Sequence, residues 1–144
     1  MAHAQNSVII TRPAAEVYAF LADGLNNPKW RPAVISIELV QGKVGEIGAE
    51  YRQQLKGPGG RPIAGDYRII SAEPGRRLEF VVTAGPARPK GDYLLEQTAE
   101  GPKVTFTLDF EPRGLMRLMG PMIQKTMEAE VGQLTALKAV LEQG

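Results

Sequence analysis

The sequence predicts an α+β fold in which a curved antiparallel sheet of seven strands wraps around one long C-terminal helix. Two observations predict it. Between residues 34 and 110, apolar and polar residues alternate with a period of two, and turns rich in Gly and Pro separate the segments. From residue 122 to 143 a helical period replaces this pattern. Such short connections imply antiparallel strands, and the long helix is the element able to cover the sheet.

The N-terminal part predicts one strand followed by two short helices. The strand is expected at residues 6–11, where β-branched residues cluster. Pro13 marks the first turn of a helix, and Asp23-Gly24 closes that helix with a residue that tolerates positive φ. Asn27-Pro28 then begins a second, very short helix that ends near Trp30.

Six further strands complete the predicted sheet. They are expected at residues 34–41, 49–56, 61–73, 77–84, 91–99 and 103–110. The last of them shows the pattern most clearly, because four apolar residues alternate with polar ones: Val104, Phe106, Leu108 and Phe110. This alternation is typical of a strand with one buried and one wet face.

Several segments carry a resemblance to a known family. They are RPAAEVYAFLAD (residues 12–23), Pro28 with Trp30, AEPGRRLEF (72–80), GDYLLE (91–96) and LTALKAVLE (134–142). In this order they resemble the polyketide cyclase/dehydrase and lipid-transport family of the START-like, helix-grip (SRPBCC) superfamily. The resemblance implies a single START-like domain over residues 1–144 with a ligand-sized cavity. These motifs are structural, so the resemblance indicates the fold better than the activity.

Composition excludes several classes of function. The chain has no cysteine, which excludes disulfides, thiolate metal sites and cysteine nucleophiles. Its 17 basic and 16 acidic residues are spread along the sequence, so no nucleic-acid partner is expected. No stretch approaches the ~20 apolar residues of a membrane span, and residues 1–5 do not resemble a signal peptide. We therefore expect a cytoplasmic protein without membrane insertion, a monomer or a weak homodimer.

The single histidine does not indicate a catalytic or metal site. His3 is expected in a frayed terminus. Without a second histidine or any cysteine, neither a zinc site nor a Ser–His–Asp arrangement is expected. The sequence thus predicts no metal and no cofactor.

Aromatic residues on the strands are the first candidates for ligand binding. Strand alternation places five of them on the concave side: Tyr51, Tyr67, Phe80, Tyr93 and Phe106. They could form an ordinary core, but buried phenol groups need hydrogen-bond partners that a dry core seldom provides. Trp30 could either fill the end of the sheet or line the cavity mouth. A cavity on the order of 300–1,000 Å³ is the resulting prediction.

The long helix supplies the remaining candidates. Met119 and Met122 could adapt to ligand shape or simply fill gaps. Thr126, Glu130 and Gln133 fall within an otherwise apolar stripe, where buried polar groups need partners. A cavity would supply them, whereas a rotated helix would let Glu130 reach solvent. Glu130 is also the one candidate for a catalytic residue.

Three functions remain open from the sequence. The first is binding of a small hydrophobic molecule such as a lipid, a polyketide or an isoprenoid-like compound. The second is a polyketide cyclase or dehydratase in which Glu130 and a tyrosine move protons. A pocket without histidine disfavours that enzyme, since histidine is the commonest proton-transfer residue near pH 7. The third is a protein-interaction module, which predicts an exposed apolar patch.

Overall fold

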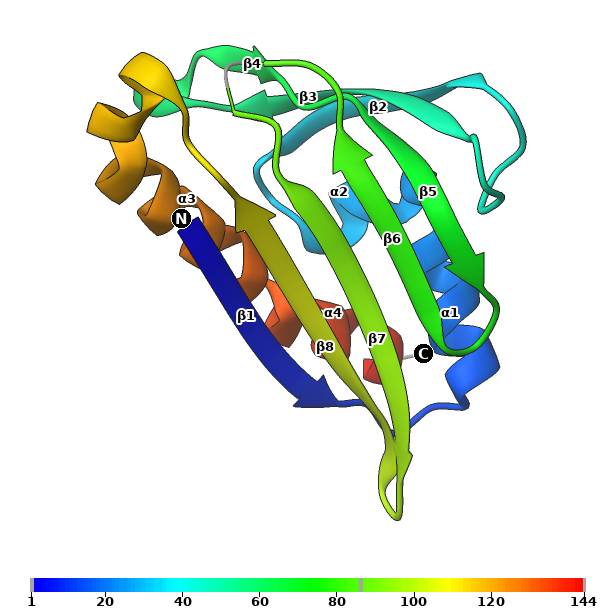
Figure 1. Cartoon of the computed structure of the whole chain (residues 1–144). Coiled ribbons are helices and arrows are strands. Elements are labelled where there is room, and N and C mark those ends of the chain that lie inside the picture. Colours follow the sequence, from blue (N-terminus) through cyan, green and yellow to red (C-terminus); the bar gives the residue numbers. More distant parts are fainter. Residues whose placement is uncertain (1, 86, 144) are drawn as a thin grey trace.

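One curved sheet contains every strand of the computed structural model, which describes residues 2–85 and 87–143 (Figure 1). The strand order is β1-β8-β7-β6-β5-β3-β2, β4 pairs with β3, and every pairing is antiparallel. The strands are β1 (Ala2–Ile9), β2 (Val34–Gln41), β3 (Glu50–Lys56), β4 (Pro62–Ala64), β5 (Tyr67–Glu73), β6 (Arg77–Val82), β7 (Lys90–Thr98) and β8 (Gly101–Phe110).

Apart from η2 (Pro58–Gly60), which connects β3 to β4, the helical segments follow β1 or β8 in the chain. They are α1 (Ala14–Ala22), η1 (Gly24–Asn26), α2 (Asn27–Trp30), η3 (Gly114–Met119), α3 (Gly120–Gly132) and α4 (Leu134–Gln143). Figure 1 shows α3 and α4 behind β1 and β8, with α1 and α2 behind β5 and β6. The predicted α+β, helix-grip architecture is therefore confirmed, including the two short helical segments after the first strand.

The strand expected over residues 61–73 is two strands. Gly65 and Asp66 interrupt it: the Gly65 N–H donates to the Gln53 carbonyl at 2.8 Å, and the Asp66 carboxylate accepts from the Gln53 N–H at 3.2 Å. A Cβ on Gly65 would lie 2.7 Å from a methyl carbon of Leu55, so a larger residue would require the Leu55 side chain to shift. β3 consequently pairs with β4 at one end and with β5 at the other.

The expectation of a frayed N-terminus is wrong. β1 begins at Ala2 and pairs with β8 along its whole length, from Ala2 opposite Phe110 to Ile9 opposite Lys103. His3 lies on the outer face, with Nδ1 2.5 Å from Oδ1 of Asp109. The inward residues at this end are Ala2 and Ala4, which are too small to give a clear alternation signal.

The C-terminal helix is broken near its middle. α3 ends at Gly132 and α4 begins at Leu134. Gly132 is a poor helix former, and the Gln133 N–H bonds to the Glu130 carbonyl at 3.2 Å, as in a tightened final turn. Ile123, Met127 and Val131 of α3, with Leu134 and Leu137 of α4, are the residues that this helical pair buries against the sheet.

Candidate functional site

A cavity of about 250 Å³ lies between the concave face of the sheet and α3. Its volume is just below the expected 300–1,000 Å³ typical of ligand pockets. Most of its lining is apolar, contributed by strands β3 to β8 and by α1, η3 and α3. Eight of the ten predicted site residues line it: Tyr67, Phe80, Tyr93, Phe106, Met119, Met122, Thr126 and Glu130.

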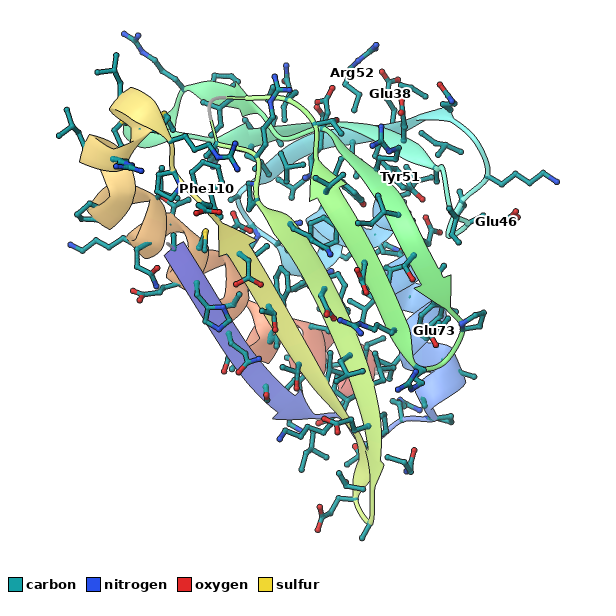
Figure 2. The ribbon with its side chains drawn as sticks, viewed as in Figure 1. Glu38, Glu46, Tyr51, Arg52, Glu73 and Phe110 are labelled. Carbon is teal, nitrogen blue, oxygen red and sulfur yellow. The ribbon has the colours of Figure 1, made fainter. Side chains whose placement is uncertain are left out.

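The other two predicted residues lie behind the cavity wall. Trp30 is 2% exposed and meets both Tyr93 and Phe106 edge-on, with ring centroids 6.3 Å apart in each pair. Tyr51 stacks on Tyr67 with centroids 5.0 Å apart. In Figure 2, Tyr51 points to the inner side of β3, whereas the next residue, Arg52, lies beside Glu38 on the outer side. Both aromatic rings thus position lining residues.

A polar network borders one part of the cavity. The Asn27 side-chain amide donates to the side-chain oxygen of Gln53 and to the Tyr67 hydroxyl, each at 3.0 Å. The Gln53 amide donates in turn to the Gly65 carbonyl at 3.3 Å. Asn27, Gln53 and Tyr67 all line the cavity, so its wall carries hydrogen-bonding groups among apolar ones.

An ion pair lies within the cavity wall. Arg31 Nη2 donates to Glu130 Oε2 at 2.5 Å, and the two side chains are only 9% and 14% exposed. Arg31 directly follows α2 as its C-cap residue, with an extended backbone. Glu130 therefore lines the cavity and does not reach into solvent, in contrast to the alternative of a rotated helix.

Burial dominates the titration behaviour of the cavity tyrosines. It raises the pKa of Tyr67 well above its usual value, and the Asn27 hydrogen bond offsets only part of this. Burial likewise raises the pKa of Tyr93, although the Arg31 charge opposes the rise. For Arg31, burial lowers the pKa, but Glu130 and the neighbouring tyrosines more than compensate, and the net pKa is raised. Both phenols are therefore neutral and Arg31 is charged across the physiological pH range.

The sequence reading missed Asn27, Arg31 and Gln53, the buried polar residues of this site. Gln53 could have been predicted, because it lies two residues after Tyr51 and so shares its face of the strand. Asn27 looked only like a helix-capping residue. Arg31 follows a one-turn helix, where no periodic pattern predicts the direction of a side chain.

The cavity mouth lies where η3 meets the start of α3. We place it there because the lining residues Met119 and Met122 are 42% and 55% exposed. Met116 of η3, Ile63 of β4 and Ala87 of the β6–β7 connection also belong to the lining. Next to it, Leu115 and Leu118 of η3 are 85% and 82% exposed. Gln133, which was expected with Thr126 and Glu130 in the polar part of the helix face, lies at the helix break outside the lining.

The polar side chains of the lining determine the chemistry of the site. Within residues 2–85 and 87–143, no cluster of three or more His, Asp or Glu side chains could hold a metal ion. No helix in the same part of the chain is both long and apolar enough to cross a membrane. The chemistry available at the cavity is that of a carboxylate, a guanidinium, two phenols, two amides and the hydroxyl of Thr126.

Comparison with known proteins agrees with this architecture. The family model described as polyketide cyclase/dehydrase and lipid transport matches residues 1–142. A START superfamily protein from Mycobacterium smegmatis superposes with a TM-score of 0.80 at 15% identity, covering 99% of each chain. A protein from Thermus thermophilus gives 0.78 at 22% identity over 99% of each chain, and Ara h 8.0201 gives 0.75 at 21% over 97% of each.

At these identities the structural likeness shows the fold alone. A search of curated proteins finds no match. The family model nevertheless spans nearly the whole sequence, with the motif segments and the cavity-lining strands inside the matched region. The chain therefore belongs to the polyketide cyclase/dehydrase and lipid-transport family, and its fold is START-like.

Proposed function

We propose that the protein binds one small, largely apolar molecule, of the lipid, polyketide or isoprenoid-like kind, between its sheet and α3. The observation that carries this proposal is the cavity of about 250 Å³, apolar over most of its lining and bordered by a few hydrogen-bonding groups. Ligand sites typically have this composition. A fully packed core would leave no such volume, since protein interiors are close-packed.

The eight lining residues named above would contact the ligand directly. Phe80, Phe106, Met119 and Met122 would supply apolar contact area, and Tyr67, Tyr93, Thr126 and Glu130 would supply polar contacts. Trp30 and Tyr51 would act indirectly, by holding the rings of Tyr93, Phe106 and Tyr67 in place.

Native mass spectrometry of the purified protein tests the proposal by detecting a retained small molecule. A matched pair of variants shows whether that molecule sits in the cavity. Met122→Trp places an indole at the mouth, and its side chain has room because Met122 is 55% exposed. Leu115→Trp adds the same ring on η3 outside the lining. We expect ligand loss in the first variant only; equal retention in both would contradict cavity binding.

An enzymatic role would use the same cavity. The presence of the Glu130 carboxylate beside Tyr93 in the lining favours it, since such a pair could move protons. If the protein is a cyclase or dehydratase, Glu130→Gln should lower turnover roughly 10²–10⁴-fold and leave binding nearly intact. If it only binds, the same change should keep affinity for an uncharged ligand within about tenfold, or ~1.4 kcal/mol.

A protein-interaction role rests on a different observation. Leu115 and Leu118 present two large, exposed apolar side chains on η3. Exposed apolar patches often mark contact surfaces. Sedimentation of the protein across a concentration series tests this idea. Association that Leu115→Ser/Leu118→Ser abolishes would support it. A protein that stays monomeric throughout would instead indicate that these two residues only form the rim of the cavity mouth.

A further inference from the structure

We propose that the cavity selects uncharged amphiphiles whose polar head is a neutral oxygen group, such as an alcohol or a ketone, and discriminates against carboxylates of equal length. This inference rests on the proposed binding function and specifies the class of ligand. It follows from the charge balance of the wall and from the hydrogen-bonding groups that the wall leaves available.

The wall is already electrically neutral. Arg31 and Glu130 are the only charged residues among the described residues that line the cavity. They contact each other at 2.5 Å, and both side chains are largely buried. One cation therefore faces one anion, and nothing in the lining is left to neutralise a third charge.

A ligand carboxylate would upset this balance. To reach Arg31 it would have to share the guanidinium with Glu130 or displace it, and either arrangement buries one negative charge without a partner. An uncompensated buried charge is strongly unfavourable. A neutral head group imposes no such cost.

A neutral oxygen would find suitable partners here. The Tyr93 hydroxyl makes no hydrogen bond to the described part of the protein, and that of Tyr67 accepts from Asn27 with its own proton still free to donate. A ketone oxygen could accept from these donors. An alcohol could also donate to Glu130 Oε1, since Arg31 holds Oε2.

Cavity size sets the length of suitable probes. At roughly 30 Å³ per non-hydrogen group, a water-sized share, 250 Å³ encloses on the order of eight groups. A ten-carbon chain would fill the interior and leave its end between Met119 and Met122 at the mouth. 1-Decanol, 2-decanone and decanoate share this length and differ in their heads.

The experiment measures the affinity of all three probes at pH 8, where decanoate is ionised, by titration calorimetry. Trp30 gives a second readout, because it is the only tryptophan and packs against two lining residues. We expect wild type to bind decanol and decanone at least tenfold more tightly than decanoate. Glu130→Gln leaves the Arg31 charge uncompensated, so decanoate affinity should rise at least tenfold while decanol stays within tenfold.

Two further variants keep the test decisive. Glu128→Gln changes an exposed carboxylate on the same helix outside the lining, and should leave all three affinities unchanged. Arg31→Gln/Glu130→Gln removes both charges and should keep the wild-type order of preference. If Glu130→Gln does not fold, the wild-type order and this double variant decide the outcome.

The possible failures are distinguishable. If wild type binds decanoate as well as decanol, or the foldable Glu130→Gln variant shows no gain for decanoate, the head-group inference is overturned and the binding function stands. A gain for decanoate in the double variant overturns it too. If none of the probes binds wild type, the inference and the proposed function are overturned together.

Discussion

Arg31 and Glu130 join two helical segments that lie 99 residues apart in the sequence. Nη2 of Arg31, at the end of α2, meets Oε2 of Glu130, on α3, at 2.5 Å. The contact ties the short helices that follow β1 to the helix that closes the sheet (Figure 1). The two side chains are only 9% and 14% exposed, so each charge depends on the other.

Removing one member of this pair should destabilise the fold strongly. We expect Glu130→Leu to lower the free energy of unfolding by about 3–5 kcal/mol, because it leaves the Arg31 charge buried and unpaired. The double change Arg31→Met/Glu130→Leu removes both charges and should recover most of that loss. Urea unfolding of the three proteins at pH 7 measures both values.

The surface pair between Arg52 and Glu38 provides the control. Its side chains are 65% and 60% exposed, and both project from the outer side of the β2–β3 hairpin (Figure 2). Glu38→Leu should change stability by no more than about 1 kcal/mol. Similar losses for Glu130→Leu and Glu38→Leu would contradict the buried character of the inner pair.

The four tyrosines predict how the fold responds to alkaline pH. Burial is the largest cause that raises the pKa of Tyr18, Tyr51, Tyr67 and Tyr93. Unfolded tyrosine ionises near pH 10, so the unfolded chain releases protons that the folded chain retains. The free energy of unfolding should therefore be insensitive to these groups below pH ~10 and fall as the pH rises above it.

Ultraviolet absorbance of tyrosinate, followed with circular dichroism, checks this prediction. We expect the tyrosines to ionise together with unfolding. Tyr67→Phe/Tyr93→Phe should flatten the alkaline loss of stability, because the two most strongly shifted groups are gone. Ionisation of all four residues near pH 10 in a fold that stays intact would contradict it.

The sheet was predictable because its signal is local and repeated. Alternation in β8 and punctuation by turns such as Glu73-Pro74-Gly75 depend only on neighbouring residues. The departures have tertiary causes. The break at Gly65 and Asp66 accompanies their hydrogen bonds to Gln53 of β3, and the pairing of Ala2 and Ala4 depends on β8, which lies a hundred residues away.

The residues of the candidate site were predictable where the period of a strand or helix determines the direction of their side chains. Alternate residues of a strand face the same side, and each strand from β5 to β8 places one aromatic ring in the cavity lining in this way: Tyr67, Phe80, Tyr93 and Phe106. Glu130 lines it because it shares a helix face with Met127 and Ile123. Arg31 could not be found in this way, since its direction depends on how α2 docks against α3 and not on any period.

Gly91 should be intolerant of a side chain because the Phe80 ring lies over it. The two residues are opposite each other on β6 and β7, and a Cβ on Gly91 would fall 2.1 Å from the ring. Gly91→Ala must push Phe80 towards the cavity, with an expected loss of about 1–3 kcal/mol of stability. Ligand binding should weaken as well, because Phe80 is part of the lining.

Two variants check this assignment by thermal and urea unfolding. Gly91→Ala/Phe80→Leu gives the added methyl group room and should recover part of the lost stability. Gly132→Ala is the control, because a Cβ there meets no atom within 4 Å and alanine favours a helix. If Gly91→Ala is as stable as wild type, the close packing of Phe80 on Gly91 is refuted.

The carboxylate of Glu142 should stabilise the docking of α4 at neutral pH and lose this effect at acid pH. Its Oε2 accepts from Lys138 Nζ at 2.6 Å and from the Thr11 N–H at 2.9 Å, which joins the last helix to the chain leaving β1. These hydrogen bonds, the one from Lys138 foremost, lower the pKa of Glu142 to about 2. An unfolded glutamate titrates near ~4.3, so below that value the unfolded chain takes up a proton before the folded chain does.

The stability that Glu142 contributes should thus be fully present above pH ~4.3 and be lost as the pH falls towards about 2. Glu142→Gln lacks the charge at every pH, so it should be less stable than wild type at pH 7, with the difference shrinking steadily between pH 4 and pH 2. Urea unfolding of both proteins across this range measures it. Glu46→Gln, in the exposed loop after β2 (Figure 2), is the control and should follow wild type throughout. A difference between wild type and Glu142→Gln that stays constant down to pH 2 would mean that the carboxylate charge does not hold α4 to the end of β1.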